Sequence, residues 1–219
     1  MIDKIVASSE AALADVPDGA TVMIGGFGNA GMPATLIDAL IARGARNLTI
    51  VNNNAGNADA GLAALIKAKR VRRILCSFPR QADSWHFDGL YRAGEIELEL
   101  VPQGTLAERI RAAGAGIGAF YTPTAYGTRL AEGKETRRID GRDYVLEYPI
   151  HADYALIKAD RADRWGNLCY RKSARNFGPI MASAAKCTVA QVREVVELGA
   201  LDPEAVVTPG IFVKRVVKH

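Results

Sequence analysis

A glycine-rich segment near the N-terminus is the first feature with chemical meaning. Four of the seven residues from 25 to 31 are glycine, and they contain the spacing Gly-x-Gly-x-x-Gly between an apolar run and a helical pattern. Glycine lets the backbone approach a ligand closely, and a helix N-terminus favours negative charge. A tight turn that needs positive φ angles is the structural alternative. We predict that an anionic or carbonyl-bearing ligand contacts this segment, which consists of Gly25, Gly26, Phe27, Gly28, Asn29, Ala30 and Gly31.

The same glycine spacing occurs in dinucleotide-binding folds, but two features argue against a nicotinamide site. In those folds the second strand ends in an acidic residue that holds the ribose, whereas residues 52–54 are all asparagine. Pro33 also removes a backbone N–H from the expected first helical turn. From these residues alone, a nucleotide- or sugar-phosphate-binding α/β module remains open as an alternative to an enzyme.

Polar side chains follow three further strands of the expected sheet. Asn53 and Asn54 follow the second strand, Ser77 and Arg80 follow the third, and Gln103 follows the fourth. Ligands of parallel sheets bind beyond the carboxyl ends of the strands, so these groups should line one crevice with the glycine segment. Amide donors can stabilise an oxyanion by about 3 kcal/mol each. We therefore expect Asn53, Asn54 and Gln103 to polarise a carbonyl group, with a turn-forming role as the alternative for the asparagines.

A nucleophile is missing from this set. The sequence has no Gly-x-Ser-x-Gly elbow, and its three cysteines match neither a metal-binding nor a redox spacing. His86, His151 and His219 occur singly and are interpreted as surface or core residues. A site with oxyanion donors but no nucleophile is incomplete, so we predict that a partner chain completes it. We predict no metal site.

The elements that must position these groups alternate between strands and helices. Short apolar runs predict strands, and apolar residues at helical spacing predict helices. Alternation of this kind predicts an α/β fold with an open, mainly parallel sheet and helices on both faces. Residues 121–149 form a small β-containing excursion, with a hairpin turn at 140–142, in a single domain of residues 1–219. The expected strands are 21–24, 48–51, 71–77, 96–101, 154–159, 187–192 and 211–213, and the expected helices are 33–43, 61–68 and 106–113.

Composition narrows the class of protein. The formal net charge is +4 with scattered basic residues, which does not indicate a nucleic-acid-binding protein. No apolar run is long enough for a membrane span, and the N-terminus does not resemble a signal peptide. The few cysteines are typical of reduced thiols. We expect a cytoplasmic protein that binds neither nucleic acid nor membrane.

Residues 18–33, 102–111, 119–123 and 171–177 form four stretches that resemble one known family. This family is the family I coenzyme A (CoA) transferases, which consist of an α chain and a β chain, and the similarity is to the α chain. The resemblance implies the CoA-transferase fold and a partner β chain in an α2β2 assembly. It also implies a covalent glutamyl–CoA thioester, formed on a glutamate in a Ser-Glu-Asn-Gly motif of the β chain, and CoA as a substrate rather than a permanently bound cofactor. On this resemblance the glycine segment would contact CoA, and Asn53, Asn54 and Gln103 would be the catalytic amides.

Two further stretches bear on the substrate. Residues 76–81 and 90–94 are similar to the family branch that transfers CoA from succinyl-CoA to 3-oxoadipate in the degradation of aromatic compounds. Acetoacetate is the alternative acceptor. The second carboxylate of 3-oxoadipate could pair with Arg80, and we predict Arg80 and Ser77 as substrate-binding residues. A solvated surface arginine is the alternative for Arg80.

Overall fold

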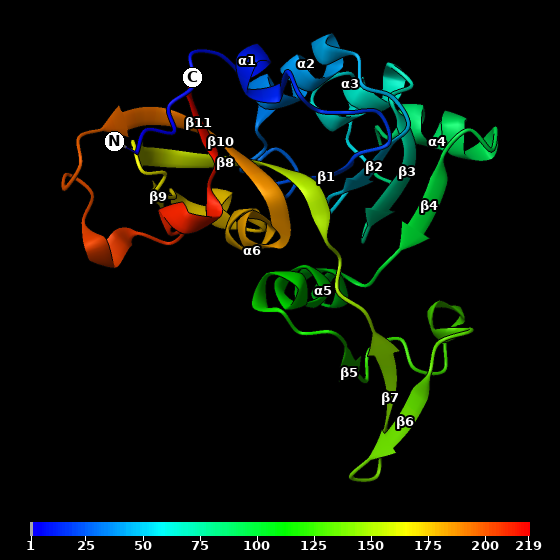
Figure 1. Ribbon diagram of the computed structural model, residues 1–219. Helices are drawn as coiled ribbons and strands as arrows, with labels where there is room; N and C mark the ends of the chain where they lie inside the picture. Colours follow the sequence, from blue (N-terminus) through cyan, green and yellow to red (C-terminus); the bar gives the residue numbers. More distant parts are fainter. Residues whose placement is uncertain (1) are drawn as a thin grey trace.

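The computed structural model describes residues 2–219, which form an α/β body with a small protruding arm (Figure 1). The body contains one eight-stranded sheet in the order β11-β10-β8-β1-β2-β3-β4, in which β9 pairs with β8 off this path. All pairs along the path are parallel, and only β9 is antiparallel to its neighbour. The strands are β1 (Thr21–Ile24), β2 (Leu48–Val51), β3 (Val71–Cys76), β4 (Glu97–Leu100), β8 (Ala152–Asp163), β9 (Leu168–Cys169), β10 (Ala185–Val196) and β11 (Arg215–Lys218).

Helices cover both faces of this sheet, as the sequence predicted (Figure 1). One face carries α1 (Ser9–Leu13), α2 (Ala34–Arg43), α3 (Leu62–Lys67) and α4 (Trp85–Arg92). The other carries α5 (Gln103–Ala115) and α6 (Gly178–Ala184). Short 3-10 helices are η1 (Arg129–Ala131), η2 (Lys172–Arg175), η3 (Pro203–Ala205) and η4 (Gly210–Phe212). No helix within residues 2–219 combines the length and apolarity needed to cross a bilayer.

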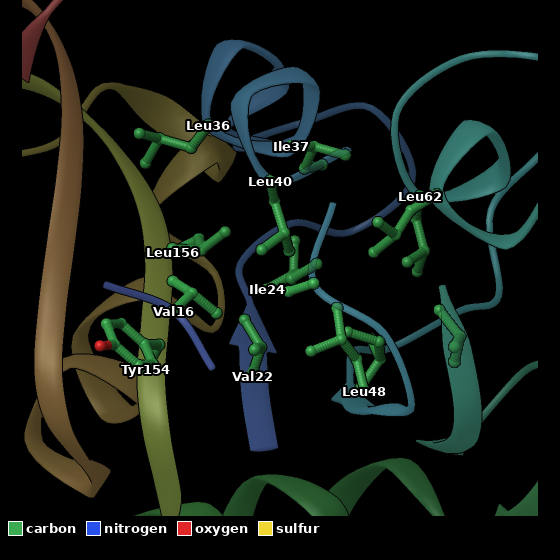
Figure 2. Packing of buried hydrophobic residues seen from close by; sticks show 14 of the residues in the cluster. Val16, Val22, Ile24, Leu36, Ile37, Leu40, Leu48, Leu62, Tyr154 and Leu156 are labelled. Carbon is green, nitrogen blue, oxygen red and sulfur yellow. The ribbon is translucent and has the colours of Figure 1, made fainter. Parts of the chain in front are cut away.

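The core is split between the two faces because successive side chains of a strand point in opposite directions. Val22 and Ile24 of β1 pack with Leu40 of α2 on one face (Figure 2). Met23, which lies between them, packs on the other face in the same cluster as Leu106 of α5. Each of these side chains is fully buried, which stabilises the fold by roughly 1.5–3 kcal/mol per residue. This packing fixes the ends of the central strands, where the polar groups lie.

The arm is a separate antiparallel sheet in the order β5-β7-β6. Its strands are β5 (Phe120–Thr122), β6 (Thr136–Ile139) and β7 (Arg142–Glu147). Asp140 and Gly141 connect β6 to β7 with φ angles of 47° and 78°, the conformation that a two-residue hairpin turn requires. The predicted excursion and its hairpin are thus confirmed.

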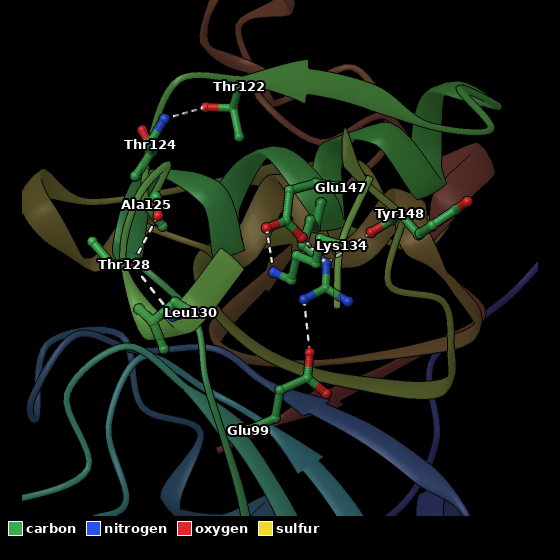
Figure 3. A network of polar contacts seen from close by, with 10 residues as sticks. Glu99, Thr122, Thr124, Ala125, Thr128, Leu130, Lys134, Glu147 and Tyr148 are labelled. Atoms are coloured by element: carbon green, nitrogen blue, oxygen red, sulfur yellow. Dashed lines mark hydrogen bonds and ion pairs between the residues drawn. The ribbon is translucent and has the colours of Figure 1, made fainter. Parts of the chain in front are cut away.

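A cluster of charged side chains around the buried Glu147 anchors the arm to the body. Glu147 is 3% exposed and pairs with Lys134 at 2.5 Å, both within the arm (Figure 3). Arg109 of α5 lies 3.6 Å from Glu147, donates to the carbonyl oxygen of Tyr148 at 2.7 Å and binds Glu99 of β4 at 2.8 Å. Arg109 therefore joins the base of the arm to both a helix and the main sheet.

The last strand differs from the expectation. The strand predicted at 211–213 is wrong, because Gly210–Phe212 forms a 3-10 turn after Pro209 and Ile211 is 76% exposed. The chain joins the sheet only at Arg215, which pairs in register with Val189 of β10. An apolar run thus looked like a strand although the glycine and proline before it place it in a turn. The three helices that were not expected, α1, α4 and α6, are short.

Candidate active site

The polar strand ends lie at the point where the sheet order reverses. From β1 the chain continues through β2, β3 and β4 on one side, and later places β8, β10 and β11 on the other. Open α/β sheets bind ligands in the crevice beyond the carboxyl ends of the strands at such a point. The glycine segment follows β1 directly.

A cavity of about 450 Å³ opens at this edge, and residues that follow four different strands line it. The structure thus brings together four of the predicted polar residues with two members of the glycine segment. Phe78 and Gln81, which were not predicted as site residues, also line it, although they lie in the same turn as Ser77. None of the lining side chains is ionisable at neutral pH. They are Phe27, Gly28, Asn53, Asn54, Ser77, Phe78, Gln81 and Gln103.

Asn53 is the centre of this cavity's hydrogen bonding. Its side-chain oxygen, Oδ1, accepts from Ser77 Oγ at 2.8 Å and from Gln103 Nε2 at 2.9 Å. The amide nitrogen Nδ2 lies on the other side of the group from this oxygen. Among residues 2–219, Nδ2 forms no hydrogen bond. Asn53 is 1% exposed and lines the cavity, so Nδ2 is available to donate a hydrogen bond to a group in the cavity.

The neighbouring asparagines support the strand ends. Asn52 Nδ2 donates to the carbonyl oxygen of Ile24 at 2.6 Å, and Asn52 Oδ1 accepts from the backbone of Asn54 at 2.8 Å. Asn52 is fully buried and thereby connects the end of β1 to the end of β2. Asn54 Oδ1 accepts from the backbone N–H of Gly28 at 3.4 Å, which links the cavity wall to the glycine segment.

The glycine segment forms a compact turn rather than an open cradle of free N–H groups. Phe27 and Ala30 pair with each other through both backbone hydrogen bonds, and Gly28 between them has a φ of 58°. The structural alternative for these glycines, a tight turn that needs positive φ angles, therefore describes the segment. Of the seven residues of the glycine segment, only Asn29 and Gly31 have a backbone N–H group without a hydrogen bond to another of residues 2–219. The other five, Gly25, Gly26, Phe27, Gly28 and Ala30, each donate one.

Asn176 connects the glycine segment to the loop after β9. Its Oδ1 accepts from the N–H of Gly26 at 3.2 Å, and its Nδ2 donates to the carbonyl oxygen of Ala30 at 2.9 Å. A Cβ at Gly31 would overlap the carbonyl oxygen of Ala174, so glycine is needed for this close approach. Asn176 lies in a stretch that carried the family resemblance, but no local pattern predicted its contact across about 150 residues of sequence.

Arg80 lies outside the cavity. Its Nη2 pairs with Asp88 of α4 at 2.8 Å, and the side chain is 60% exposed. The turn that carries Arg80 also carries Phe78 and Gln81, which do line the cavity. The side chain is therefore close to the site in sequence but is directed to a neighbouring helix.

The structure places no strong nucleophile in the cavity. Cys76 immediately precedes Ser77 but is buried, and burial raises the pKa of its thiol to about 12. A thiol with that pKa is protonated at neutral pH and is a poor nucleophile. No cluster of three or more His, Cys, Asp or Glu side chains within residues 2–219 could hold a metal ion. The cavity lining can therefore polarise a carbonyl group, and it contains no strong nucleophile.

Comparisons with known proteins identify the family of the chain. Residues 6–219 match the profile of a family described as coenzyme A transferase. The chain is 69% identical over 217 residues to the α chain of the 3-oxoadipate CoA-transferase of Pseudomonas putida, covering 99% of this chain and 94% of that one. It is 52% identical to the α chain of the succinyl-CoA:3-ketoacid CoA transferase of Xanthomonas campestris, over 98% and 88% of the two chains.

A solved structure shows the same fold. The acyl-CoA transferase of Escherichia coli O157:H7 superposes with a TM-score of 0.88 at 24% identity, over 99% of this chain and 47% of that one. The sequence match, which spans nearly the whole chain, and the shared fold lead to one assignment. The chain belongs to the coenzyme A transferase family.

Proposed function

We propose that this chain is the α chain of an enzyme that transfers CoA from succinyl-CoA to 3-oxoadipate. One observation carries the proposal: the cavity contains positioned amide donors and no ionisable group. The 69% identity to the α chain of a 3-oxoadipate CoA-transferase supports the choice of acceptor. CoA is then a substrate rather than a resident cofactor, and the enzyme acts in the cytoplasm on small molecules.

The geometry suggests how the transfer is assisted. A glutamate carboxylate of the β chain attacks the thioester carbonyl of succinyl-CoA, and negative charge develops on the carbonyl oxygen. The thiolate that leaves then attacks the glutamyl carbonyl, which releases succinate and leaves CoA on the glutamate. In this proposal Asn53 Nδ2 donates to the developing oxyanion, and the hydrogen bonds from Gln103 and Ser77 to Asn53 Oδ1 support the orientation of the amide. Asn54 and the glycine segment complete the wall that contacts CoA.

The β chain would also close the cavity. Phe27 and Phe78 line it and are 51% and 56% exposed, so two aromatic rings face solvent at the edge of a polar site. Exposed aromatic surface of this kind is typical of interfaces. A partner that covers these rings would exclude water and bring its carboxylate to the amides, in an α2β2 assembly.

Arg80 is proposed to recognise the second carboxylate of 3-oxoadipate. Its pair with Asp88 is exposed, and exposed ion pairs contribute only about 0–1 kcal/mol, so the guanidinium can exchange partners. Ser77, which lies on the cavity wall, would contact the same substrate. We expect Arg80→Met to lower kcat/KM for 3-oxoadipate about tenfold or more and to leave acetoacetate unaffected. Arg92→Met, at the end of α4, is the control; an unchanged preference in Arg80→Met would refute the role of Arg80.

The proposed function is tested by co-expressing this chain with the β chain and measuring transfer from succinyl-CoA to 3-oxoadipate and to acetoacetate. We expect activity only in the pair, with the higher kcat/KM for 3-oxoadipate. Higher activity with acetoacetate would support the reaction class but would show that acetoacetate, and not 3-oxoadipate, is the preferred acceptor. Full activity of this chain alone would refute the division of the site between two chains.

A further inference from the structure

Gln81 lines the amide cavity, but the proposed transfer gives it no role. It lies in the turn after β3, on the wall of the same cavity as Asn53. Its side-chain oxygen Oε1 accepts from Asn57 Nδ2, whereas its side-chain nitrogen Nε2 forms no hydrogen bond within residues 2–219. Gln81 is half-buried, so one end of its amide is held by the protein and the other end, a donor, is available to the cavity.

The turn that carries Gln81 is tied to the loop after β2. The backbone N–H of Gln81 donates to Ser84 Oγ at 3.0 Å, and the N–H of Ser84 donates to the carbonyl oxygen of Gln81 at 3.2 Å. Ser84 is 4% exposed, and its Oγ lies 3.1 Å from the carbonyl oxygen of Gly56 and 3.2 Å from Asn57 Oδ1. Gly56 and Asn57 follow β2, so both the backbone and the side chain of Gln81 are restrained by a neighbouring loop.

The order of the strands places Gln81 on the acyl side of the cavity. Along β1, β2 and β3, which are neighbours in the sheet, the glycine segment follows the first, Asn53 the second and Gln81 the third. In the proposed function, CoA contacts the glycine segment and the thioester carbonyl lies at Asn53. The acyl chain then extends away from CoA, toward the turn after β3. Neighbouring strands lie about 4.8 Å apart, so a short acyl chain spans the step from Asn53 to Gln81.

We propose that Gln81 Nε2 donates a hydrogen bond to the second carboxylate of the acceptor and thereby favours 3-oxoadipate over acetoacetate. The position of the thioester at Asn53 is taken from the proposed function, on which this inference rests. The second carboxylate lies five carbon–carbon bonds from the transferred carbonyl, roughly 6 Å in an extended chain. Acetoacetate ends instead in a methyl group, which an amide donor cannot bind. A carboxylate accepts several hydrogen bonds, so Gln81 and Arg80 can bind the same group.

The first test compares kcat/KM for 3-oxoadipate and for acetoacetate in the αβ complex, with succinyl-CoA as the donor. Because transfer through a covalent intermediate is ping-pong, kcat/KM for the acceptor does not include the half-reaction of succinyl-CoA. Gln81→Met removes the donor at similar size, and we expect a loss of about tenfold or more with 3-oxoadipate but less than about twofold with acetoacetate. Gln81→Glu adds a negative charge at the same position, and we expect a loss of roughly 100-fold with 3-oxoadipate.

A further variant acts on Gln81 through Asn57, which does not line the cavity. Asn57→Asp replaces the Nδ2 donor by an acceptor, so the Gln81 amide must turn over for its Nε2 to bind the new carboxylate. Gln81 Oε1 would then face the cavity, and we expect the preference for 3-oxoadipate to fall about tenfold. Asn47→Asp is the matched control, because it makes the same change at an exposed turn and should keep the parent preference.

An unchanged ratio of the two kcat/KM values in Gln81→Met would overturn the proposal. An equal loss with both acceptors would also overturn it, because the amide would then act on a step that both share. Calorimetric titration of the αβ complex with adipate and hexanoate tests the same contact without turnover, since hexanoate has a methyl group in place of the second carboxylate. We expect the parent to bind adipate more tightly and Gln81→Met to reduce that difference about tenfold.

The titration separates this inference from the proposed function. Equal binding of adipate and hexanoate by the parent, or an undiminished difference in Gln81→Met, would overturn the role of Gln81. A complex in which Gln81→Met reduces the difference, but which transfers no CoA to 3-oxoadipate, would contradict the proposed function and support the carboxylate contact.

Discussion

The amide of Asn53 gives the most specific prediction about catalysis. Replacement of Asn53 by aspartate keeps the shape of the side chain, and one carboxylate oxygen can still accept from Ser77 and Gln103. The other oxygen takes the place of Nδ2 at the cavity wall. A donor is thereby exchanged for a negative charge at the position where an oxyanion would form.

The expected loss follows from the role of the lost donor. Removal of one oxyanion donor typically lowers kcat by about 10²–10³, and the added negative charge increases the loss. Ser77→Ala is milder, because Asn53 Oδ1 keeps its bond from Gln103 at 2.9 Å. One net hydrogen bond contributes about 1 kcal/mol, so we expect roughly a fivefold loss in kcat. The two variants should therefore differ by more than tenfold.

The assay is steady-state transfer from succinyl-CoA to 3-oxoadipate by the αβ complex, with melting temperatures as a check on folding. Asn47→Asp provides a matched control, since it makes the same chemical change at an exposed turn before β2. We expect Asn47→Asp to retain parent kinetics. A folded Asn53→Asp complex with kcat within threefold of the parent would refute the assignment of Asn53 Nδ2 as an oxyanion donor.

Three further predictions concern the elements around the site. Gly31→Ala should destabilise the chain by about 1–3 kcal/mol in urea unfolding and should lower activity, because a Cβ would overlap the Ala174 carbonyl at a φ of 75°; parent-like stability would contradict the close packing of the two loops. Arg109→Met should cost about 2–3 kcal/mol, because Glu147 is buried and keeps only Lys134; a loss below about 0.5 kcal/mol by the same measurement would show that Arg109 does not anchor the arm. The third concerns stability in acid. Hydrogen bonds from Arg215 lower the pKa of Asp15 from 3.8 to about 2. The ion pair therefore stabilises the fold above about pH 4, and this stabilisation is lost as the pH falls toward 2. Since Asp15 is 54% exposed, we discount its contribution to the free energy of unfolding to about 1 kcal/mol. We expect Asp15→Asn to flatten the decline of the free energy of unfolding between pH 4 and 2. An unchanged slope would contradict this link between the pKa and stability.

The sequence predicted the sheet and the gathering of polar groups because both depend on local pattern. Strand β1, for example, is a four-residue apolar run whose alternate residues pack on opposite faces. Once a parallel sheet is expected, the residues after Val51, Cys76 and Leu100 must lie at one edge. The cavity lined by Asn53, Ser77 and Gln103 follows from that geometry.

Local pattern could not predict contacts between distant loops. Asn176 meets Gly26 and Ala30 only because β8 and β9 bring the later loop beside the end of β1. The direction of Arg80 was equally inaccessible, since its partner Asp88 lies on α4, a helix of eight residues that contains a glycine and buries only Phe87. Loop contacts and long side chains depend on tertiary packing, which one sequence does not display.

The central claim is that this chain supplies only the amide half of the site, and locating the covalent intermediate tests that claim most directly. The αβ complex would be incubated with succinyl-CoA in the absence of acceptor, and the intact mass of each chain would be determined. We predict an increase by one CoA, less one water, on the β chain only, and an unmodified mass for this chain. Its cavity lining contains no carboxylate. CoA attached to a glutamate or aspartate of this chain would contradict the claim that it supplies only the amide half of the site.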